Sequence, residues 1–198
     1  MMDLIDLMSD DTHLDRLTLT YLKRAEELIS EIKNCSDSKK SGVSEDLYHI
    51  GLEFDAGGSI CQSDEVAFIC FLTAAEAGHV EAQYRVGLAY DTGYGVDENL
   101  SESRRWYGLA AEQDHPKALC GLGYSYFRDE SDPNNANMAA NCFLRSEQLF
   151  DPEGTYYLGL CYLEGYGVRK SVERAECYIR KASELGSSDA KQYLSFTN

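Results

Sequence analysis

The sequence has little positive charge and no long apolar run. Its 198 residues include 18 Lys and Arg against 34 Asp and Glu, which gives a net charge of -16 at pH 7. Because this surplus of negative charge repels phosphate groups and anionic lipid headgroups, we expect no nucleic-acid partner. The longest apolar run, residues 66–75, has about half of the roughly 20 residues that span a bilayer. We therefore expect no membrane insertion.

An export signal and a regular cysteine pattern are also missing. The opening residues, MMDLIDLMSDD, contain four Asp and no Lys or Arg, whereas a secretory signal begins with positive charge. The seven cysteines are an odd number and show no recurring pairs. Since structural disulfides are typical of exported proteins, these observations predict reduced thiols and a cytoplasmic location.

The sequence contains no recognisable catalytic or metal-binding signature. Its four histidines stand at positions 13, 49, 79 and 115, and no Cys-x-x-Cys pair occurs, so we expect no metal site. The Gly-Tyr-Gly strings at 93–95 and 165–167 lack the third glycine or the lysine of phosphate-binding loops, and we interpret them as turns. No nucleophile elbow is present. We expect no cofactor and no enzymatic activity, and a hydrolase that uses a thiol or hydroxyl is the weaker alternative.

What the sequence does contain is a helix-turn-helix unit that recurs every 36 residues. Ala82, Val86, Gly87 and Tyr90 follow helical spacing, and the glycines at 93–95 then end the pattern. The position of Gly87 recurs without insertion or deletion as Gly51, Gly87, Gly123 and Gly159. A period of this length predicts a solenoid of stacked helix pairs.

Several other columns repeat with the same period. The second helix of each repeat carries three such columns. The first column is small (Ala67, Ser103, Ala139 and Ala175), the second is large (Phe71, Tyr107, Phe143 and Ile179), and the third is small again (Ala74, Ala110, Ser146 and Ala182). We expect these columns to face the core. A junction column holds His79, His115, Asp151 and Ser187, with Pro following at 116 and 152. Proline suits the first helical turn, so this column predicts helix N-caps between units.

These motifs resemble the Sel1-like repeat, a relative of the tetratricopeptide repeat. The second and fourth repeats match best. In the second repeat the matching residues are Gly87-Leu88, Tyr90, Gly93-Tyr94-Gly95-Val96, Trp106-Tyr107 and Ala110-Ala111. In the fourth repeat they are Gly159-Leu160, Tyr162, Gly165-Tyr166-Gly167-Val168, Tyr178 and Ala182. The resemblance implies an all-α, right-handed superhelical solenoid. It also implies an adaptor or scaffold that binds other proteins.

The predicted organisation has two parts. Residues 1–43 are expected to form an acidic lead, a capping helix and a linker. Four repeats follow at 44–79, 80–115, 116–151 and 152–187, with a C-terminal stub to residue 198. Ser44 is the expected N-cap of the first repeat, and residues 35–43 are the expected linker.

The capping helix is predicted from an amphipathic pattern in residues 12–34. Its apolar stripe consists of Leu14, Leu17, Tyr21, Ala25, Leu28 and Ile32. A solenoid end has to be covered, so this helix would cap the first repeat. Alternatively, the stripe binds a partner or a second copy of the chain. The sequence leaves the oligomeric state open.

Charge is distributed unevenly along the repeats. Residues 44–103 hold twelve acids and one base, Arg85, whereas residues 104–198 hold thirteen acids and eleven bases. Such acidity predicts either simple solubility or a surface for a basic protein. By analogy with tetratricopeptide arrays, a concave face would bind the partner through Tyr48, Asp55, Glu81, Tyr84, Leu88, Asp91, Tyr124, Phe127, Arg128 and Tyr156. The column of Tyr48, Tyr84 and Tyr156 is equally compatible with packing between repeats.

The sequence therefore predicts a non-catalytic protein-interaction module with an acidic, tyrosine-rich concave face. Its partner is a protein, and the charge points to a basic one. The alternative is an immunity or inhibitor protein that neutralises a cognate toxin or effector.

Overall fold

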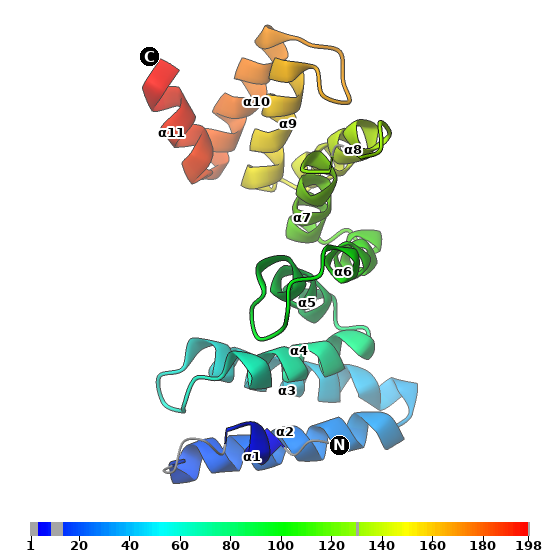
Figure 1. Cartoon of the computed structure of the whole chain (residues 1–198), viewed down its shortest axis with the longest axis vertical. Coiled ribbons are helices and arrows are strands. Elements are labelled where there is room, and N and C mark those ends of the chain that lie inside the picture. The colour runs from blue at the N-terminus through cyan, green and yellow to red at the C-terminus, as the bar shows by residue number, and fades with distance from the viewer. Residues whose placement is uncertain (1–3, 9–13, 130, 198) are drawn as a thin grey trace. The chain divides into compact units, whose positions relative to one another are not determined.

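The computed structural model describes residues 4–8, 14–129 and 131–197, and every regular element among them is an α-helix (Figure 1). The helices are α1 (Leu4–Leu7), α2 (Arg16–Asn34), α3 (Asp37–Ala56), α4 (Asp64–Glu76), α5 (Val80–Thr92), α6 (Leu100–Glu112), α7 (Pro116–Phe127), α8 (Asn135–Gln148), α9 (Pro152–Glu164), α10 (Val172–Leu185) and α11 (Ser188–Thr197). The chain divides into two compact units, residues 1–106 and 107–198, and the division falls inside α6.

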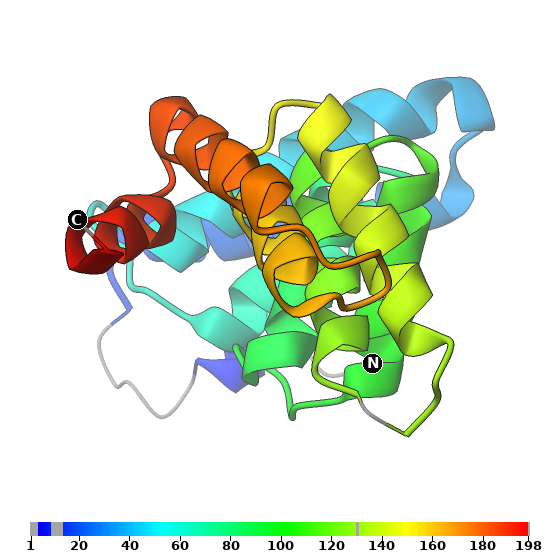
Figure 2. The same ribbon diagram turned by 90° about the horizontal axis from the view of Figure 1, so that it is seen from above.

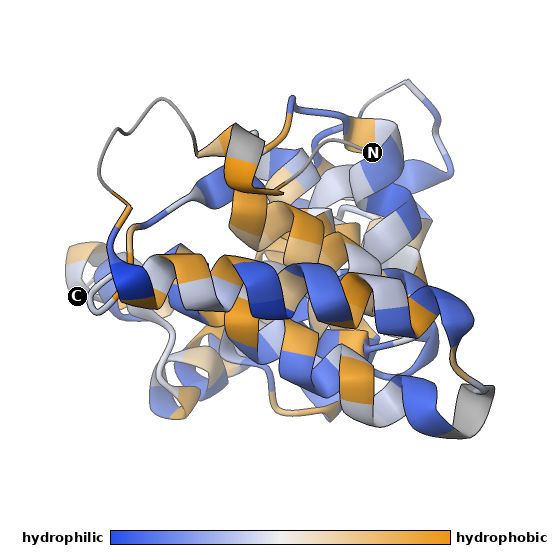
Figure 3. Ribbon diagram, turned by 90° about the horizontal axis from the view of Figure 1, so that it is seen from below, coloured by the Kyte–Doolittle hydropathy of each residue, from blue (hydrophilic) through white to orange (hydrophobic). Residues whose placement is uncertain are grey.

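Unit 1 is a stack of helices in chain order. Helix α2 packs against α3, α3 against α4 and α4 against α5, while α1 packs on α2 (Figure 1). The face of α2 that meets α3 buries Leu22, Ala25 and Leu28, and hydrophobic and hydrophilic segments alternate along this helix in Figure 3. The helix before the first repeat therefore covers it, as expected for the end of a solenoid.

Unit 2 repeats this arrangement. Helix α7 packs against α8, α8 against α9 and α9 against α10. The last helix, α11, follows α10 through a short turn and packs on it (Figure 2). Its residue Ala190 is fully buried, so α11 covers the end of the fourth helix pair.

The predicted core columns of the second helices are confirmed. All twelve small and large residues of these columns, from Ala67 to Ala182, are at most 3% exposed. The glycine column of the first helices explains how the helices approach each other. A Cβ on Gly51 would lie 2.6 Å from the ring of Phe71, and one on Gly123 would lie 2.7 Å from the ring of Phe143. Glycine is therefore required where the two helices of a pair are closest.

The junction column caps the helices as predicted. The Nδ1 atoms of His79 and His115 accept hydrogen bonds from the backbone N–H groups of Ala82 and Ala118, each at 3.1 Å. In unit 2, Asp151 accepts from the N–H of Gly154 at 2.7 Å. Pro116 and Pro152 occupy the first helical turn, where the N–H group that proline lacks has no helical partner.

The predicted linker and N-cap of the first repeat are wrong. Helix α3 begins at Asp37, so residues 37–43 are helical and only Cys35 and Ser36 separate α2 from α3. Ser44 lies within α3, is 2% exposed, and donates its hydroxyl hydrogen bond to the Ser41 carbonyl oxygen at 3.0 Å. The local composition, which is polar and contains a glycine, was misleading because packing of α2 against α3 can outweigh weak helix propensity.

The predicted stripe of the first long helix is partly wrong. Ala25, Leu28 and Ile32 are buried, but Leu17 is 45% exposed and the adjacent Thr18 is buried in its place. Thr18 is buried because its hydroxyl group donates to the N-cap residue Asp15 at 2.8 Å and accepts from the N–H of Cys61 at 3.0 Å. The helix begins at Arg16, and residues 12 and 13 of the predicted range lie outside the described part of the chain.

Two further properties bear on function. Among the described residues, no helix combines the length and apolar character needed to cross a membrane. All seven cysteines carry free thiols, and Cys70, Cys120 and Cys161 are buried.

Candidate functional site

The Gly-Tyr-Gly turn after α5 positions the site in unit 1. Gly93 ends α5 in the left-handed conformation at φ 72°, and its N–H group donates to the carbonyl oxygen of Ala89. Gly95 follows at φ 66°, and a Cβ there would lie 2.2 Å from the carbonyl oxygen of Asp64. The turn of the second repeat is therefore held directly against the start of α4, which belongs to the first repeat.

This turn carries Tyr94 to the connection between α3 and α4. Its hydroxyl oxygen lies 3.5 Å from Nε2 of Gln62, which also donates to the carbonyl oxygen of Asp55 at 3.1 Å. Burial raises the pKa of Tyr94, and hydrogen bonding to the carboxylates of Asp64 and Asp55 raises it further. Tyr94 is therefore a neutral group that, through Gln62, joins the turn to the connection between α3 and α4 of the preceding repeat.

Beside Tyr94 lies a hollow between α3, α4 and α5. Its volume is about 230 Å³, and it is lined by Asp55, Phe68, Phe71, Arg85, Leu88, Ala89, Thr92 and Tyr94. Most of this lining is apolar. It combines a hydrophobic interior with a few polar groups, which is the composition expected of a binding pocket.

The polar part of the hollow is an ion pair. Nη1 of Arg85 on α5 donates to Oδ2 of Asp55 on α3 at 3.1 Å, and both side chains are about one-third exposed or less. The guanidinium carbon of Arg85 also lies 5.7 Å from the centre of the Phe71 ring. Arg85 Nε is buried and has no hydrogen-bond partner among the described residues.

The structure places the predicted residues of unit 1 in different environments. Tyr48 is only 9% exposed, stacks on His79 at 4.6 Å between ring centres, and contacts the ring of Phe71. Asp55 and Leu88 both line the hollow between α3, α4 and α5. Glu81, Tyr84 and Asp91 are partly exposed on α5.

In unit 2 the predicted residues belong to an aromatic cluster. Phe127 packs against Phe143, Tyr157 and Tyr166 with ring centres 4.9–6.5 Å apart. Tyr124 lies 5.2 Å from Tyr157. Burial raises the pKa of Tyr157 to about 12, so this ring is neutral at physiological pH.

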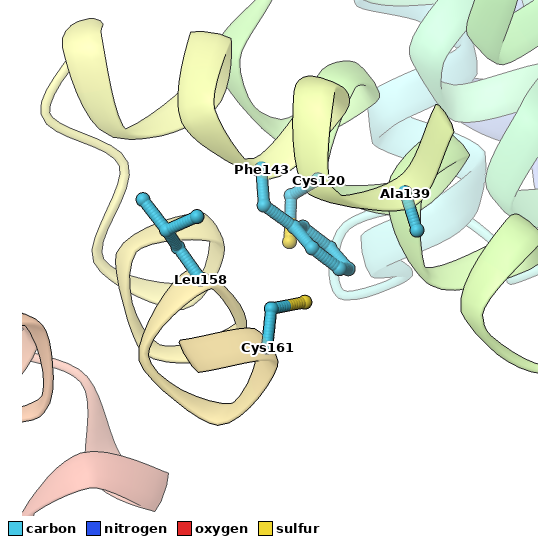
Figure 4. Packing of buried hydrophobic residues seen from close by; sticks show 5 residues of the cluster. All are labelled: Cys120, Ala139, Phe143, Leu158 and Cys161. Carbon is cyan, nitrogen blue, oxygen red and sulfur yellow. The ribbon is translucent and has the colours of Figure 1, made fainter. Parts of the chain in front are cut away.

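The remaining predicted residues lie beside this cluster. The guanidinium carbon of Arg128 sits 4.9 Å above the Tyr124 ring. Tyr156 contacts Tyr193 of α11 at 6.5 Å, so α11 covers part of it. Figure 4 shows the core beneath, with the ring of Phe143 beside Cys120 of α7 and Cys161 of α9 facing it.

Three of the residues of the hollow that sequence reasoning missed carry aromatic or charged groups. Phe68 was assigned no role, Arg85 was noted only as an isolated base, and Tyr94 was interpreted as part of a turn. The recurrence of tyrosine at 94 and 166, always between two glycines, was a signal that could have revealed the role of the turn. The hydroxyl group of Tyr166 likewise donates to the carbonyl oxygens of Tyr126 and Phe127 at 3.4 and 3.5 Å.

The described part of the chain has no group of three or more His, Cys, Asp or Glu that could hold a metal ion. The buried thiols are also poor nucleophiles, because burial raises the pKa of Cys70 and that of Cys161 to about 12. The apolar lining of the hollow and its few polar groups make it the candidate binding site of unit 1.

Comparison with known proteins identifies the repeats. A sequence model of the Sel1 repeat matches residues 44–79, 80–115, 116–149 and 152–187. A search of curated proteins finds no match to the sequence.

The solved structures that are similar to this chain include the following two. A protective antigen present in uropathogenic Escherichia coli strains, which displays an SLR fold, is 29% identical with a TM-score of 0.70, and the match covers 74% of this chain and 32% of the antigen. The chain thus spans about a third of that protein. A Sel1 repeat protein from Oxalobacter formigenes is 27% identical with a TM-score of 0.69, over 86% of this chain and 73% of that one.

Sel1 repeat proteins are generally protein-interaction modules. The four matched repeats and the all-helical solenoid show that this chain belongs to the Sel1 repeat family.

Proposed function

We propose that this protein is a non-catalytic adaptor or scaffold that binds a basic protein partner through the acidic face of its first two repeats. The observation that carries the proposal is the pairing of Arg85. It is the one base among twelve acids in residues 44–103, and Asp55 neutralises its charge. The same stretch holds eleven further acids and no second base.

The position of the hollow supports this assignment. Protein interfaces gain most of their affinity from a few anchors in pockets, and charges around the pocket mainly steer the partner and raise the association rate. Helix α5 carries both elements, because Leu88 lines the hollow and Glu81 and Asp91 lie near the two ends of the same helix. The seven free thiols fit a reducing compartment such as the cytoplasm.

The proposal can be tested with a random peptide display library selected on the full chain at low salt. We expect enrichment of peptides that carry Lys or Arg. In the Glu81→Lys/Asp91→Lys variant, a selected peptide should associate more slowly, with a smaller change in dissociation and a weaker dependence on salt. Stopped-flow or surface-based kinetics would measure both rates.

A matched control separates steering from net charge. The Glu112→Lys/Glu184→Lys variant changes the charge of the chain by the same amount at two exposed positions of unit 2. It should retain most of the association rate. Equal effects of the two variants, or selection of peptides without basic residues, would contradict the proposal, and melting curves would show that both variants are folded.

A further inference from the structure

The hollow in unit 1 has a counterpart in unit 2, because the same helix arrangement recurs after 72 residues. The residues that correspond are Asp55 and Phe127, Phe71 and Phe143, Arg85 and Tyr157, and Tyr94 and Tyr166. The Gly95 and Gly167 turns also correspond, since a Cβ on either would lie within 2.2 Å of a carbonyl oxygen at the start of α4 or α8. The two places can therefore be compared residue by residue.

In unit 2, the chain supplies its own aromatic ring at this place. The ring of Phe127 lies 4.9 Å from that of Tyr166 and 6.5 Å from those of Phe143 and Tyr157. These three rings are the counterparts of Tyr94, Phe71 and Arg85, all of which line the hollow. Phe127 therefore shows which kind of side chain this arrangement accommodates.

In unit 1, the corresponding side chain is the carboxylate of Asp55, and a hollow of about 230 Å³ remains. Packing alone does not require the ion pair, because unit 2 has aromatic residues at both positions. The pair even leaves Arg85 Nε buried without a partner among the described residues, which lowers stability. The ion pair and the open space beside it therefore indicate a role in binding rather than in folding.

We propose that the hollow binds one aromatic side chain from a cationic segment of the partner, in the place that Phe127 fills in unit 2. This inference rests on the proposed function and specifies its anchor. The volume is below the roughly 300–1,000 Å³ of pockets for drug-sized ligands, so it suits a single side chain.

The lining favours an aromatic ring over an aliphatic side chain. Phe68 and Phe71 line the hollow with aromatic rings, and the flat guanidinium group of Arg85 is a good stacking partner for a third ring. The neighbouring charges favour basic residues on either side of that ring. The carboxylate of Asp64 accepts from Nε2 of Gln62, which also lies beside the Tyr94 hydroxyl group, and Asp91 lies on α5 next to Thr92 of the lining.

The test uses seven-residue peptides of the form Lys-Lys-Gly-X-Gly-Lys-Lys, in which X is Phe, Leu or Ala. NMR titration of the full chain would give the affinities and the affected residues. We expect the Phe peptide to bind about tenfold or more tightly than the Ala peptide, with the Leu peptide between them, because aromatic anchors dominate interface energy. The largest shifts should occur at Phe68, Phe71 and Leu88.

Three variants show whether the ring enters the hollow. Asp55→Phe should place the chain's own ring there and reduce the Phe peptide to the affinity of the Ala peptide. Asp55→Phe/Arg85→Tyr reproduces the residues of unit 2. This double variant replaces the single variant if Asp55→Phe is unstable, since that change removes the ion-pair partner of Arg85. Glu53→Phe is the matched control, since it removes the same charge and adds the same ring at an exposed position of α3. It should leave the preference for Phe unchanged.

The outcomes separate the two proposals. Salt-dependent binding of all three peptides with equal affinity would overturn the aromatic anchor and leave the proposed acidic surface intact. The same conclusion follows if the Leu peptide binds as tightly as the Phe peptide, or if filling the hollow has no effect. Failure of every peptide to bind at low salt would overturn the proposed function, and the anchor with it.

Discussion

The junction between repeats one and two and the junction between repeats three and four have the same backbone plan and different interiors. In both, a Gly-Tyr-Gly turn reaches back to the start of the preceding repeat's second helix. In unit 1 the enclosed residues include the ion pair of Asp55 and Arg85, whereas in unit 2 they are Phe127 and Tyr157. The difference teaches that the turn is the common structural feature of these two junctions, and that the residues it encloses can vary.

The largest expected effect tests the shared turn. Gly95→Ala and Gly167→Ala should each lower the free energy of unfolding by about 2–5 kcal/mol, because a Cβ would collide with a carbonyl oxygen and the residue needs positive φ. Thermal and urea denaturation followed by circular dichroism would measure the loss.

Gly58→Ala is the control for these variants. Gly58 also has positive φ, at 91°, but a Cβ there would meet nothing within 4 Å. Only the conformational cost should remain, about 1–2 kcal/mol. If the three variants were equally destabilised, close contact between the turn and the preceding repeat would not be the constant feature of the two junctions.

The next effect compares the two core phenylalanines that occupy the same position. Phe71→Ala and Phe143→Ala should each cost about 3–5 kcal/mol, since both side chains are buried. The loss at Phe143 should be larger by about 0.5–1.5 kcal/mol, because its ring contacts two rings, those of Tyr157 and Phe127, whereas among the described residues Phe71 contacts one ring, that of Tyr48, and faces Arg85. Equal losses in urea denaturation would mean that the aromatic cluster adds no stability over the ion pair.

A smaller effect is expected when the interior of unit 1 is exchanged for that of unit 2. Asp55→Phe/Arg85→Tyr should leave stability unchanged or raise it by up to about 2 kcal/mol, because well-packed apolar residues often replace a partly buried ion pair without loss. The reverse exchange, Phe127→Asp/Tyr157→Arg, should destabilise unit 2. A clear loss of stability in the first double variant would show that the ion pair is needed for folding.

The last comparison concerns the reactivity of two cysteine thiols and needs no substitution. Cys70 and Cys142 occupy equivalent positions, and burial raises the pKa of Cys70 to about 12 and that of Cys142 to about 11. A higher pKa leaves less thiolate at pH 8, by about tenfold per pKa unit. Iodoacetamide should therefore modify Cys142 about ten times faster than Cys70, with exposed Cys177 as the internal reference. Peptide mapping by mass spectrometry would measure the rates, and equal rates would show that the two sites are equally buried.

The sequence predicted most of the architecture because the relevant rules are local and repeated. The spacing of Gly51, Gly87, Gly123 and Gly159 specified the helix pairs. Small and large residues at a helical period specified the buried faces, and the residues before Pro116 and Pro152 specified the caps. Each of these signals depends on a few neighbouring residues, and four copies make it unambiguous.

The tertiary structure decided which distant residues meet. Asp55 and Arg85 are 30 residues apart, and their pairing depends on how α3 and α5 are packed, so neither charge could be assigned from its neighbours. Tyr48 was compatible with either partner binding or packing between repeats, and it is stacked against His79, the N-cap residue of α5. The α3 helix likewise extends through residues 37–43 because α2 packs on it.

By itself, then, the sequence determined the repeat, its period, its buried faces and its acidity, since these follow from residue type and spacing. Only the tertiary structure showed that the single base of the acidic stretch is already paired, that Tyr94 contacts the preceding repeat, and that a hollow lies beside them. The physical reason is that side-chain contacts between repeats depend on the packing distance and orientation of whole helices, which no local pattern specifies.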